Sequence, residues 1–192
     1  AAESEKFLEN LPCLPVSEIH QILVEWNNTQ AFYTRTTPLH RLIESQAAQT
    51  PERTAVRMAR SSLNPVQTSE TLSFTELNRR ANQLAHHLRA KGIFPGSLVG
   101  ICLERSLEMV VGVLGILKAG AAYVPLDPAY PHERLAFMLT DSQTEMVVTQ
   151  ASLNPVLPIS NRQMVCLDSD WDVIGRESTE NPTWSVSSET PA

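Results

Sequence analysis

The sequence predicts an α/β fold in which helices cover a parallel sheet. Apolar runs of strand length occur at residues 97–103, 121–126 and 145–150. Helical patterns fill the gaps between them, at residues 106–120 and 131–142. Strands and helices that alternate at these lengths are typical of parallel sheets built from right-handed crossovers.

Two amphipathic helices are expected before this alternation begins. In residues 17–27 the apolar side chains share one face, Ser17 can cap the start, and the stripe is Ile19, Ile22, Leu23 and Trp26. Residues 39–50 repeat the pattern before Pro51, with a stripe of Leu39, Leu42, Ile43 and Ala47. We expect residues 1–37 to form a linker and residues 38–192 to form part of one domain.

The first elements of the domain are predicted to be a hairpin and a long helix. TAVRMA and TLSF indicate two short strands, and the polar stretch 59–70 between them is typical of a hairpin tip. The helix spans residues 73–92, with Ser73 and Glu76 at capping-box spacing and Gly92 at the carboxyl end. Its buried stripe is predicted to contain Leu77, Ala81, Leu84, Ala85 and Leu88.

The remaining elements follow the same logic. The run at 97–103 is almost unbroken, as expected for a strand covered on both faces. Residues 106–120 are apolar all round and predict a buried helix that ends at Gly120. Pro131 suits the start of the next helix, which places Leu135 and Leu139 together. MVCLD, residues 164–168, indicates one more strand.

Composition excludes several classes of function. The net charge of −6 argues against a general nucleic-acid partner, which needs a basic face. The longest apolar run, Met109–Leu117, is too short to cross a bilayer, and the first ten residues lack the apolar core of a signal peptide. Cys13, Cys102 and Cys166 have no metal-ligand spacing, which predicts reduced thiols in a cytoplasmic protein.

Three features invite a chemical interpretation beside a structural one. Gly112, Gly115 and Gly120 match no nucleotide-binding motif, so close packing of helices is the favoured role. Lys118 lies at a helix end, where a cation interacts favourably with the carbonyl dipole. Asp127 lies where open α/β sheets bind ligands, but a role in the turn before the next helix is favoured.

The histidines and serines show no catalytic or metal-binding pattern. His86 and His87 are adjacent on a helix and point in different directions. No carboxylate or histidine is at ligand spacing from the others, which are His20, His40 and His132. Ser106 lies outside the GxSxG context of a nucleophile. The sequence therefore predicts no catalytic, cofactor-binding or metal site within these residues.

Two stretches resemble a known family. LSFTELNRRANQLAHHL and LKAGAAYVPLDPAYPHERLAFMLTDS resemble the first two signature regions of amino-acid adenylation domains in nonribosomal peptide synthetases, which belong to the adenylate-forming enzyme superfamily. The second signature is complete from Leu117 to Arg134, and the first departs at Phe74, where tyrosine is usual. Residues 39–56 resemble the opening helix and first strand of such a domain, and residues 11–30 resemble the linker after a condensation domain.

The resemblance implies a fold and a parent reaction. The chain would be the N-terminal portion of the large lobe, ending before the family's Ser/Thr/Gly-rich phosphate-binding loop. The parent would activate an amino or related carboxylic acid with ATP and Mg²⁺ and load it onto a carrier-domain phosphopantetheine thiol. No residue of this sequence matches a family catalytic position, so the chain alone is expected to be inactive, and its expected partners are the condensation domain, the remaining adenylation domain and the carrier domain.

Two other interpretations stay open. The chain could belong to an acyl-CoA synthetase, although DPAYPHER and WNNT resemble peptide synthetases more. It could instead be a non-catalytic interaction module that uses its two leading helices. If the chain is a shortened adenylation domain, the unpaired strand at the edge of its sheet predicts that it self-associates or is marginally stable. The identity of the activated acid is not encoded in these residues.

Overall fold

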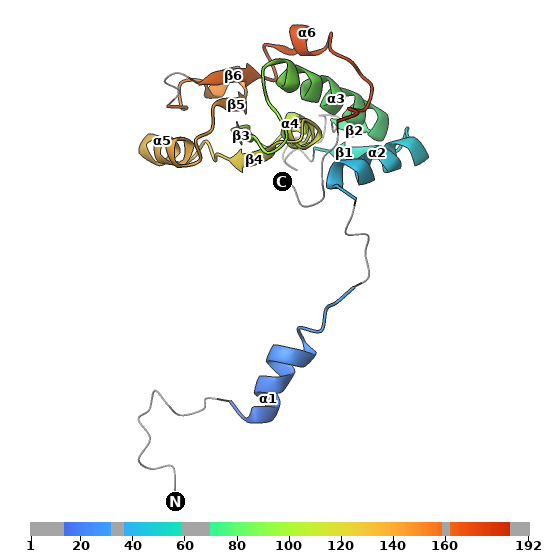
Figure 1. Ribbon diagram of the computed structural model, residues 1–192, viewed down its shortest axis with the longest axis vertical. Helices are drawn as coiled ribbons and strands as arrows, with labels where there is room; N and C mark the ends of the chain where they lie inside the picture. The colour runs from blue at the N-terminus through green and yellow to red at the C-terminus, as the bar shows by residue number, and fades with distance from the viewer. Residues whose placement is uncertain (1–13, 32–36, 59–69, 159–161, 185–192) are drawn as a thin grey trace, which may run out of the picture. The chain divides into compact units, whose positions relative to one another are not determined.

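A computed structural model describes residues 14–31, 37–58, 70–158 and 162–184 of the 192-residue chain (Figure 1). The chain divides into two compact units, residues 1–34 and residues 35–192. Among the described residues, no helix has both the length and the hydropathy needed to span a membrane.

In residues 14–31, the described part of the first unit, the chain forms one short helix whose side chains are all accessible. α1 (Val16–His20) continues into a single π-helical turn, η2 (Gln21–Glu25), and neither contains a buried residue. Pro15 precedes the helix and Ser17 lies inside it, so the expectation that Ser17 caps the start is wrong. Pro15 occupies the N-cap position with φ −57°, and no side chain accepts a hydrogen bond from the first amides of α1.

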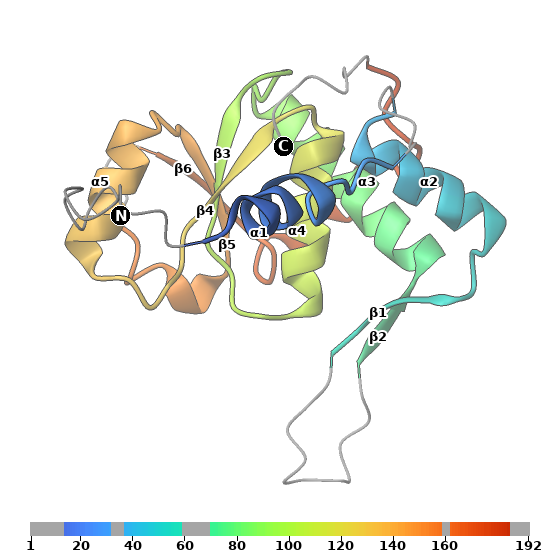
Figure 2. The ribbon, with the colours of Figure 1, turned by 90° about the horizontal axis from the view of Figure 1, so that it is seen from below.

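The second unit is built on a hairpin and a four-stranded parallel sheet (Figures 1 and 2). The hairpin pairs β1 (Thr54–Arg57) with β2 (Thr71–Ser73), and nearly all of its predicted tip lies outside the described residues. The sheet has the order β4-β3-β5-β6, with β3 Leu98–Ile101, β4 Ala122–Pro125, β5 Met146–Thr149 and β6 Gln163–Cys166. The predicted parallel α/β fold is confirmed, while self-association through an edge strand stays a prediction.

Helices cover both faces of this sheet (Figure 2). One core joins side chains of β3, β5 and β6 to α3 (Phe74–Ala90) and α4 (Leu107–Lys118). The other core lies on the opposite face and joins β5 to α5 (His132–Asp141) and the 3₁₀ turn η3 (Ala151–Leu153). The remaining helices are α2 (Leu39–Gln49) and α6 (Trp171–Ile174). The alternation of strand side chains between two covered faces explains the continuous apolar runs in the sequence.

The predicted ends of α3 are confirmed. The Ser73 hydroxyl accepts a hydrogen bond from the Glu76 amide at 3.2 Å. Gly92 follows the helix with φ 96°, a left-handed conformation that glycine adopts without strain. The return half of the capping box is absent because the Glu76 carboxylate binds Arg79 and Arg80 instead.

The orientation of α2 differs from the prediction. Its buried residues are His40, Glu44 and Ala47. Leu39 and Leu42, expected in the buried stripe, are 58% and 51% exposed. The predicted stripe is therefore wrong for these two leucines, and the helix presents a partly charged face to the protein interior.

Gly115 lets α3 and α4 approach closely, as the sequence predicts for the glycines of α4. A Cβ atom at Gly115 would lie 2.6 Å from Cδ2 and 2.9 Å from Cβ of Leu84, so a side chain there cannot be accommodated without moving α3. At Gly112 the nearest atoms are the terminal methyl groups of Ile101 and Leu103, at 3.0 and 3.1 Å. Terminal methyl groups can shift, whereas a Cβ is fixed to the backbone.

We expect Gly115→Ala to destabilise the chain by about 1–3 kcal/mol, because the added methyl group overpacks the contact with Leu84. Gly112→Ala is the matched control, because replacing glycine by alanine inside a helix stabilises the helix by the same amount, about 1 kcal/mol, at both positions. Urea unfolding of the two variants measures the difference. Equal stabilities would show that the close contact between α3 and α4 is not constrained at Gly115.

Candidate functional site

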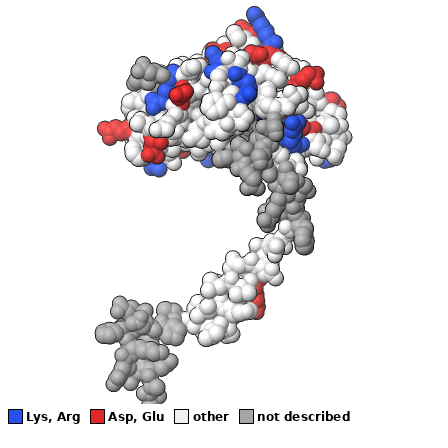
Figure 3. Space-filling view, viewed as in Figure 1, with Lys and Arg blue, Asp and Glu red and all other residues white. Residues whose placement is uncertain are grey.

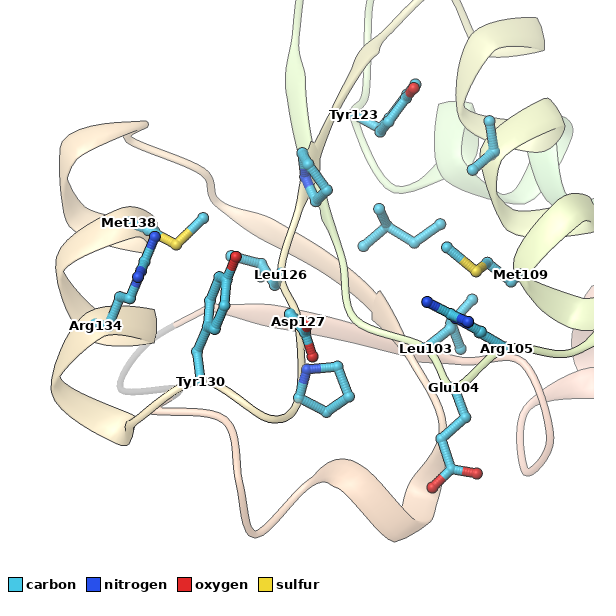
Figure 4. Close-up of a pocket in the computed structure, with 14 residues that line it drawn as sticks. Leu103, Glu104, Arg105, Met109, Tyr123, Leu126, Asp127, Tyr130, Arg134 and Met138 are labelled. Carbon is cyan, nitrogen blue, oxygen red and sulfur yellow. The ribbon is translucent and has the colours of Figure 1, made fainter.

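A cleft opens at the carboxyl ends of β3 and β4 (Figure 4). Its volume is about 610 Å³. Open α/β sheets bind ligands at this end of their strands, so the cleft is the first place to look for a site. We call it the edge cleft, and its lining includes Leu103, Glu104, Arg105, Met109, Tyr123, Leu126, Asp127, Tyr130, Arg134 and Met138.

The edge cleft combines an apolar floor with charged groups at its rim. Leu126 is buried in the floor, and the rim carries Glu104 and Arg105 after β3. On the other side the Arg134 guanidinium lies 4.2 Å from the centroid of the Tyr130 ring, a cation–π contact. Figure 4 shows the side chains of Arg105 and Arg134 on opposite sides of the cleft. This arrangement can hold an apolar group and an anion, but it presents no nucleophile.

Asp127 lies in the edge cleft, yet its carboxylate is used by the backbone. Oδ1 accepts a hydrogen bond from the Ala129 amide at 2.9 Å, two residues further along the chain. This local turn directs the chain towards α5, which begins after Pro131. The favoured structural interpretation of Asp127 is therefore confirmed.

The two described cysteines are free and buried, as predicted for reduced thiols. Burial, with a smaller contribution from the charge of Asp127, raises the pKa of the Cys102 thiol to about 11. A thiol with such a pKa is protonated at neutral pH and does not act as a nucleophile. Cys13 lies outside the described residues.

Lys118 has a role that the sequence did not reveal. Its side chain is buried, and Nζ donates a hydrogen bond to Oε1 of Glu44 at 2.5 Å. Arg41 donates to the other carboxylate oxygen at 2.9 Å. Burial lowers the pKa of the Lys118 ammonium, and the hydrogen bond to Glu44 opposes that shift. The expected interaction with the helix dipole is thus secondary to a buried ion pair.

His40 belongs to the same buried cluster. It is only 6% exposed and lies on the α2 face that carries Glu44 one turn later. Burial lowers the pKa of His40, the charge of Glu44 opposes this, and the charges of Lys118 and Arg41 reinforce it. His20 Nδ1 also lies 3.4 Å from the Glu25 carboxylate, and among the described residues neither histidine belongs to a group of side chains that could hold a metal ion.

The other predicted residues have structural partners. His86 Nε2 is 3.1 Å from the carbonyl of Glu180, and His87 Nδ1 is 3.4 Å from the carboxylate of Glu177. The Ser106 hydroxyl caps α4 by accepting a hydrogen bond from the Met109 amide at 3.3 Å.

The resemblance implies ATP and Mg²⁺ for the full adenylation domain, and two observations in the described residues bear on these ligands. No group of three His, Cys, Asp or Glu side chains there could hold a metal ion. Lys118, the lysine of the signature motif, points inward to Glu44 and is not free to contact a phosphate.

The fold is that of an α/β protein with a cleft at the carboxyl ends of its parallel strands. The family model described as AMP-binding enzyme matches residues 43–191. One of the linear gramicidin synthase proteins of Brevibacillus parabrevis is 45% identical over 188 residues, which is 98% of this chain and 2% of that protein. A second protein of the same synthase is 46% identical over 96% of this chain and 3% of its own length. The chain thus spans only a small part of these relatives.

Solved structures agree with the sequence relatives. The AMPPNP-bound form of the nonribosomal peptide synthetase FmoA3 has a TM-score of 0.74 and 31% identity, over 88% of this chain and 17% of that one. The Klebsiella oxytoca NpsA N-terminal subdomain, at 16% identity and a TM-score of 0.63, shares the fold over 79% of this chain and 35% of its own. The chain belongs to the AMP-binding enzyme family. It corresponds to the N-terminal portion of a nonribosomal peptide synthetase adenylation domain, which confirms the resemblance seen in the sequence.

Removing one partner of the buried ion pair is expected to be costly. Lys118→Met leaves the Glu44 carboxylate buried beside Arg41 alone and should destabilise the chain by about 3–5 kcal/mol. The double variant Glu44→Leu/Lys118→Met replaces both charges by apolar groups and should recover most of that loss. Urea unfolding of the two variants tests this, and a double variant as unstable as the single one would contradict it.

The buried His40 predicts a pH dependence. Its pKa in the folded chain lies below the ordinary value of 6.5, so the unfolded chain binds the proton more readily. Stability should therefore fall as the pH decreases from about 7.5 to about 5, and His40→Gln should reduce this fall. Melting temperatures across that range provide the measurement. His132→Gln, at an exposed histidine of α5, is the control and should leave the slope unchanged.

Proposed function

We propose that this chain is the opening portion of an adenylation domain in a peptide synthetase module. The parent enzyme activates an amino or related carboxylic acid with ATP and Mg²⁺, releases pyrophosphate, and transfers the acyl group to the phosphopantetheine thiol of a carrier domain. The observation that carries this proposal is the 45% identity to a linear gramicidin synthase protein over 98% of the chain. FmoA3 structures with AMPPNP and with α-methyl-L-serine-AMP, and an artificial fusion of NpsA with a carrier domain, support it.

Within that parent, the described residues act as a scaffold. The signature from Leu117 to Arg134 forms the end of α4, strand β4, the Asp127 turn and the start of α5. Its charged side chains serve the fold, since Lys118 binds Glu44 and Arg134 stacks on Tyr130. The chain by itself is therefore proposed to be inactive, and the catalytic groups are proposed to lie in other parts of the parent.

Residues 1–37 are proposed to be the linker from an upstream condensation domain, and residues 38–192 to be the adenylation portion. The exposed apolar side chains of α1 and η2 support this, because they need a partner surface to cover them. Acidic and basic side chains are interspersed on the face of the second unit shown in Figure 3. Together with the net charge of −6, this favours protein partners over nucleic acid. The free thiols of Cys102 and Cys166 support a proposed cytoplasmic location.

Amino-acid-dependent exchange of pyrophosphate into ATP tests the proposal. We expect activity in the full-length parent and none in the 192-residue chain, because no group of side chains that could hold a metal ion lies among the described residues and Lys118 is bonded to Glu44. Reactions without amino acid provide the baseline. A parent that exchanges no pyrophosphate with any proteinogenic or related acid would overturn the proposal, and exchange by the isolated chain would overturn its scaffold role.

The acyl acceptor separates a peptide synthetase from an acyl-CoA synthetase. The parent is expected to transfer its activated acid to a phosphopantetheinylated carrier domain and not to free coenzyme A. Thioester formation with each acceptor, at matched thiol concentration, provides the comparison. A preference for coenzyme A would assign the parent to the acyl-CoA synthetases.

A further inference from the structure

The edge cleft lies where the connections of the parallel sheet change direction. From β3 the chain enters α4, which packs on one face of the sheet, and from β4 it enters α5, which packs on the opposite face. Because β3 and β4 are neighbours in the sheet, the loops that follow them separate at its carboxyl edge. Open α/β sheets bind ligands in the crevice that forms at such a point.

The walls of the edge cleft come from these two loops. The loop after β3 contributes Leu103, Glu104 and Arg105, and the loop after β4 contributes Leu126 and Asp127. The volume of about 610 Å³ lies within the range of about 300–1,000 Å³ that is usual for small-molecule sites. The position and the size of the cleft therefore both suit a small organic ligand.

Two guanidinium groups in the cleft are available to such a ligand. Neither Arg105 nor Arg134 uses its side chain in an ion pair or hydrogen bond within the part of the chain that the structure describes. Arg134 is held instead by the face of the Tyr130 ring, which leaves its N–H groups without acceptors. In Figure 4 the Arg105 side chain extends towards the loop that carries Asp127. A guanidinium with free N–H groups binds a carboxylate through paired hydrogen bonds.

A carboxylate is available on the opposite wall. Asp127 Oδ1 accepts the Ala129 amide, whereas Oδ2 has no partner among the described residues. Asp127 forms no ion pair with either arginine, and Figure 4 shows Glu104 directed away from the other labelled side chains. A ligand that is only an anion is repelled by Asp127, and one that is only a cation is repelled by Arg105. A ligand that carries both charges matches the cleft best.

The floor of the cleft suits an apolar group. Leu126 is buried there, and the unbranched thioethers of Met109 and Met138 can adapt to the shape of a ligand. The hydroxyl groups of Tyr123 and Tyr130 also line the cleft and make no hydrogen bond to another described residue. The cleft thus combines an apolar floor with unpaired charges of both signs.

We propose that the edge cleft binds a small zwitterion with an apolar body, which is the chemistry of an α-amino acid with an apolar side chain. The carboxylate of the ligand binds Arg105, its ammonium binds Oδ2 of Asp127, and its side chain packs on Leu126. Residues of this chain alone build the site. It is therefore separate from the catalytic groups proposed to lie elsewhere in the parent, and it does not depend on the function proposed above.

Three related ligands test which charges the cleft recognises. L-phenylalanine carries both charges, N-acetyl-L-phenylalanine lacks the ammonium, and L-phenylalaninamide lacks the carboxylate. Titrations of the 192-residue chain, followed by NMR chemical shifts, give the three dissociation constants. We expect each analogue to bind about tenfold more weakly than phenylalanine, because each leaves one charged group of the cleft unpaired. Failure of phenylalanine to bind would overturn the proposal, as would an analogue that binds as tightly as phenylalanine.

Two variants test whether the ligand is in the edge cleft. Arg105→Gln removes the cation, and Asp127→Asn removes the negative charge while keeping an Oδ1 acceptor for the Ala129 amide. Both should weaken phenylalanine binding about tenfold. Arg176→Gln and Glu133→Gln, at exposed residues that do not line the cleft, are the matched controls and should bind like the wild type.

The Asp127→Asn variant also separates a binding role from a folding role. It should bind N-acetyl-L-phenylalanine at least as tightly as the wild type does, because the repulsion between Asp127 and the anion is gone. A misfolded variant could not do so. Phenylalanine binding that neither Arg105→Gln nor Asp127→Asn weakens would overturn the assignment of the ligand to this cleft.

The full-length parent shows whether the cleft is used in the complete protein. Equilibrium dialysis with saturating labelled phenylalanine counts the bound equivalents. We expect the wild-type parent to bind one equivalent more than a parent carrying both Arg105→Gln and Asp127→Asn. Equal counts would overturn the role of the cleft in the parent. Pyrophosphate exchange is a separate measurement, so its absence would overturn the proposed function without removing this site.

Discussion

The buried ammonium of Lys118 determines how the helices of the second unit are arranged. Removing a charge from water is unfavourable unless an opposite charge and hydrogen bonds replace the lost hydration. Glu44 supplies that charge from α2, 74 residues earlier in the chain. To reach Lys118, α2 must turn its polar face inward, which leaves Leu39 and Leu42 largely exposed. One ion pair therefore decides which side of α2 faces the interior.

The close contact between α3 and α4 places this ion pair within reach of Asn181, in the segment 178–184 that follows α6. Because Gly115 has no side chain, Leu84 packs directly against the α4 backbone. This approach brings the amides of Asn78 and Asn82, on α3, to the same oxygen of Asn181 that Lys118 binds. A tight apolar contact and a polar cluster thus depend on each other, since a wider separation of the helices would lengthen every bond to Asn181.

Local signals were enough to predict most elements of this fold. Apolar runs located the four parallel strands, and Ser73, Gly92 and Gly120 marked helix ends because capping depends on neighbouring residues alone. Local signals could not predict three features: the orientation of α2, the burial of Lys118 and the path of residues 178–184. Each of these depends on contacts between residues that are far apart in the chain. One signal was present in the sequence, because the polar residues Asn82 and Gln83 lie between Ala81 and Leu84 of the apolar stripe of α3. The structure shows both side chains almost fully buried, and buried polar groups require hydrogen-bond partners from elsewhere in the chain.

The roles found in the signature from Leu117 to Arg134 explain why this stretch is so distinctive. Lys118 neutralises a buried carboxylate, Gly120 adopts a φ of 85° after α4, and the Asp127 carboxylate closes a turn by accepting a hydrogen bond from the Ala129 amide. Each role constrains one residue type at one position, so the whole stretch is distinctive even though none of these groups is free to react. The stretch is therefore recognisable through the packing, turn and charge-pairing positions that it occupies in the fold, because each of those positions accepts few residue types.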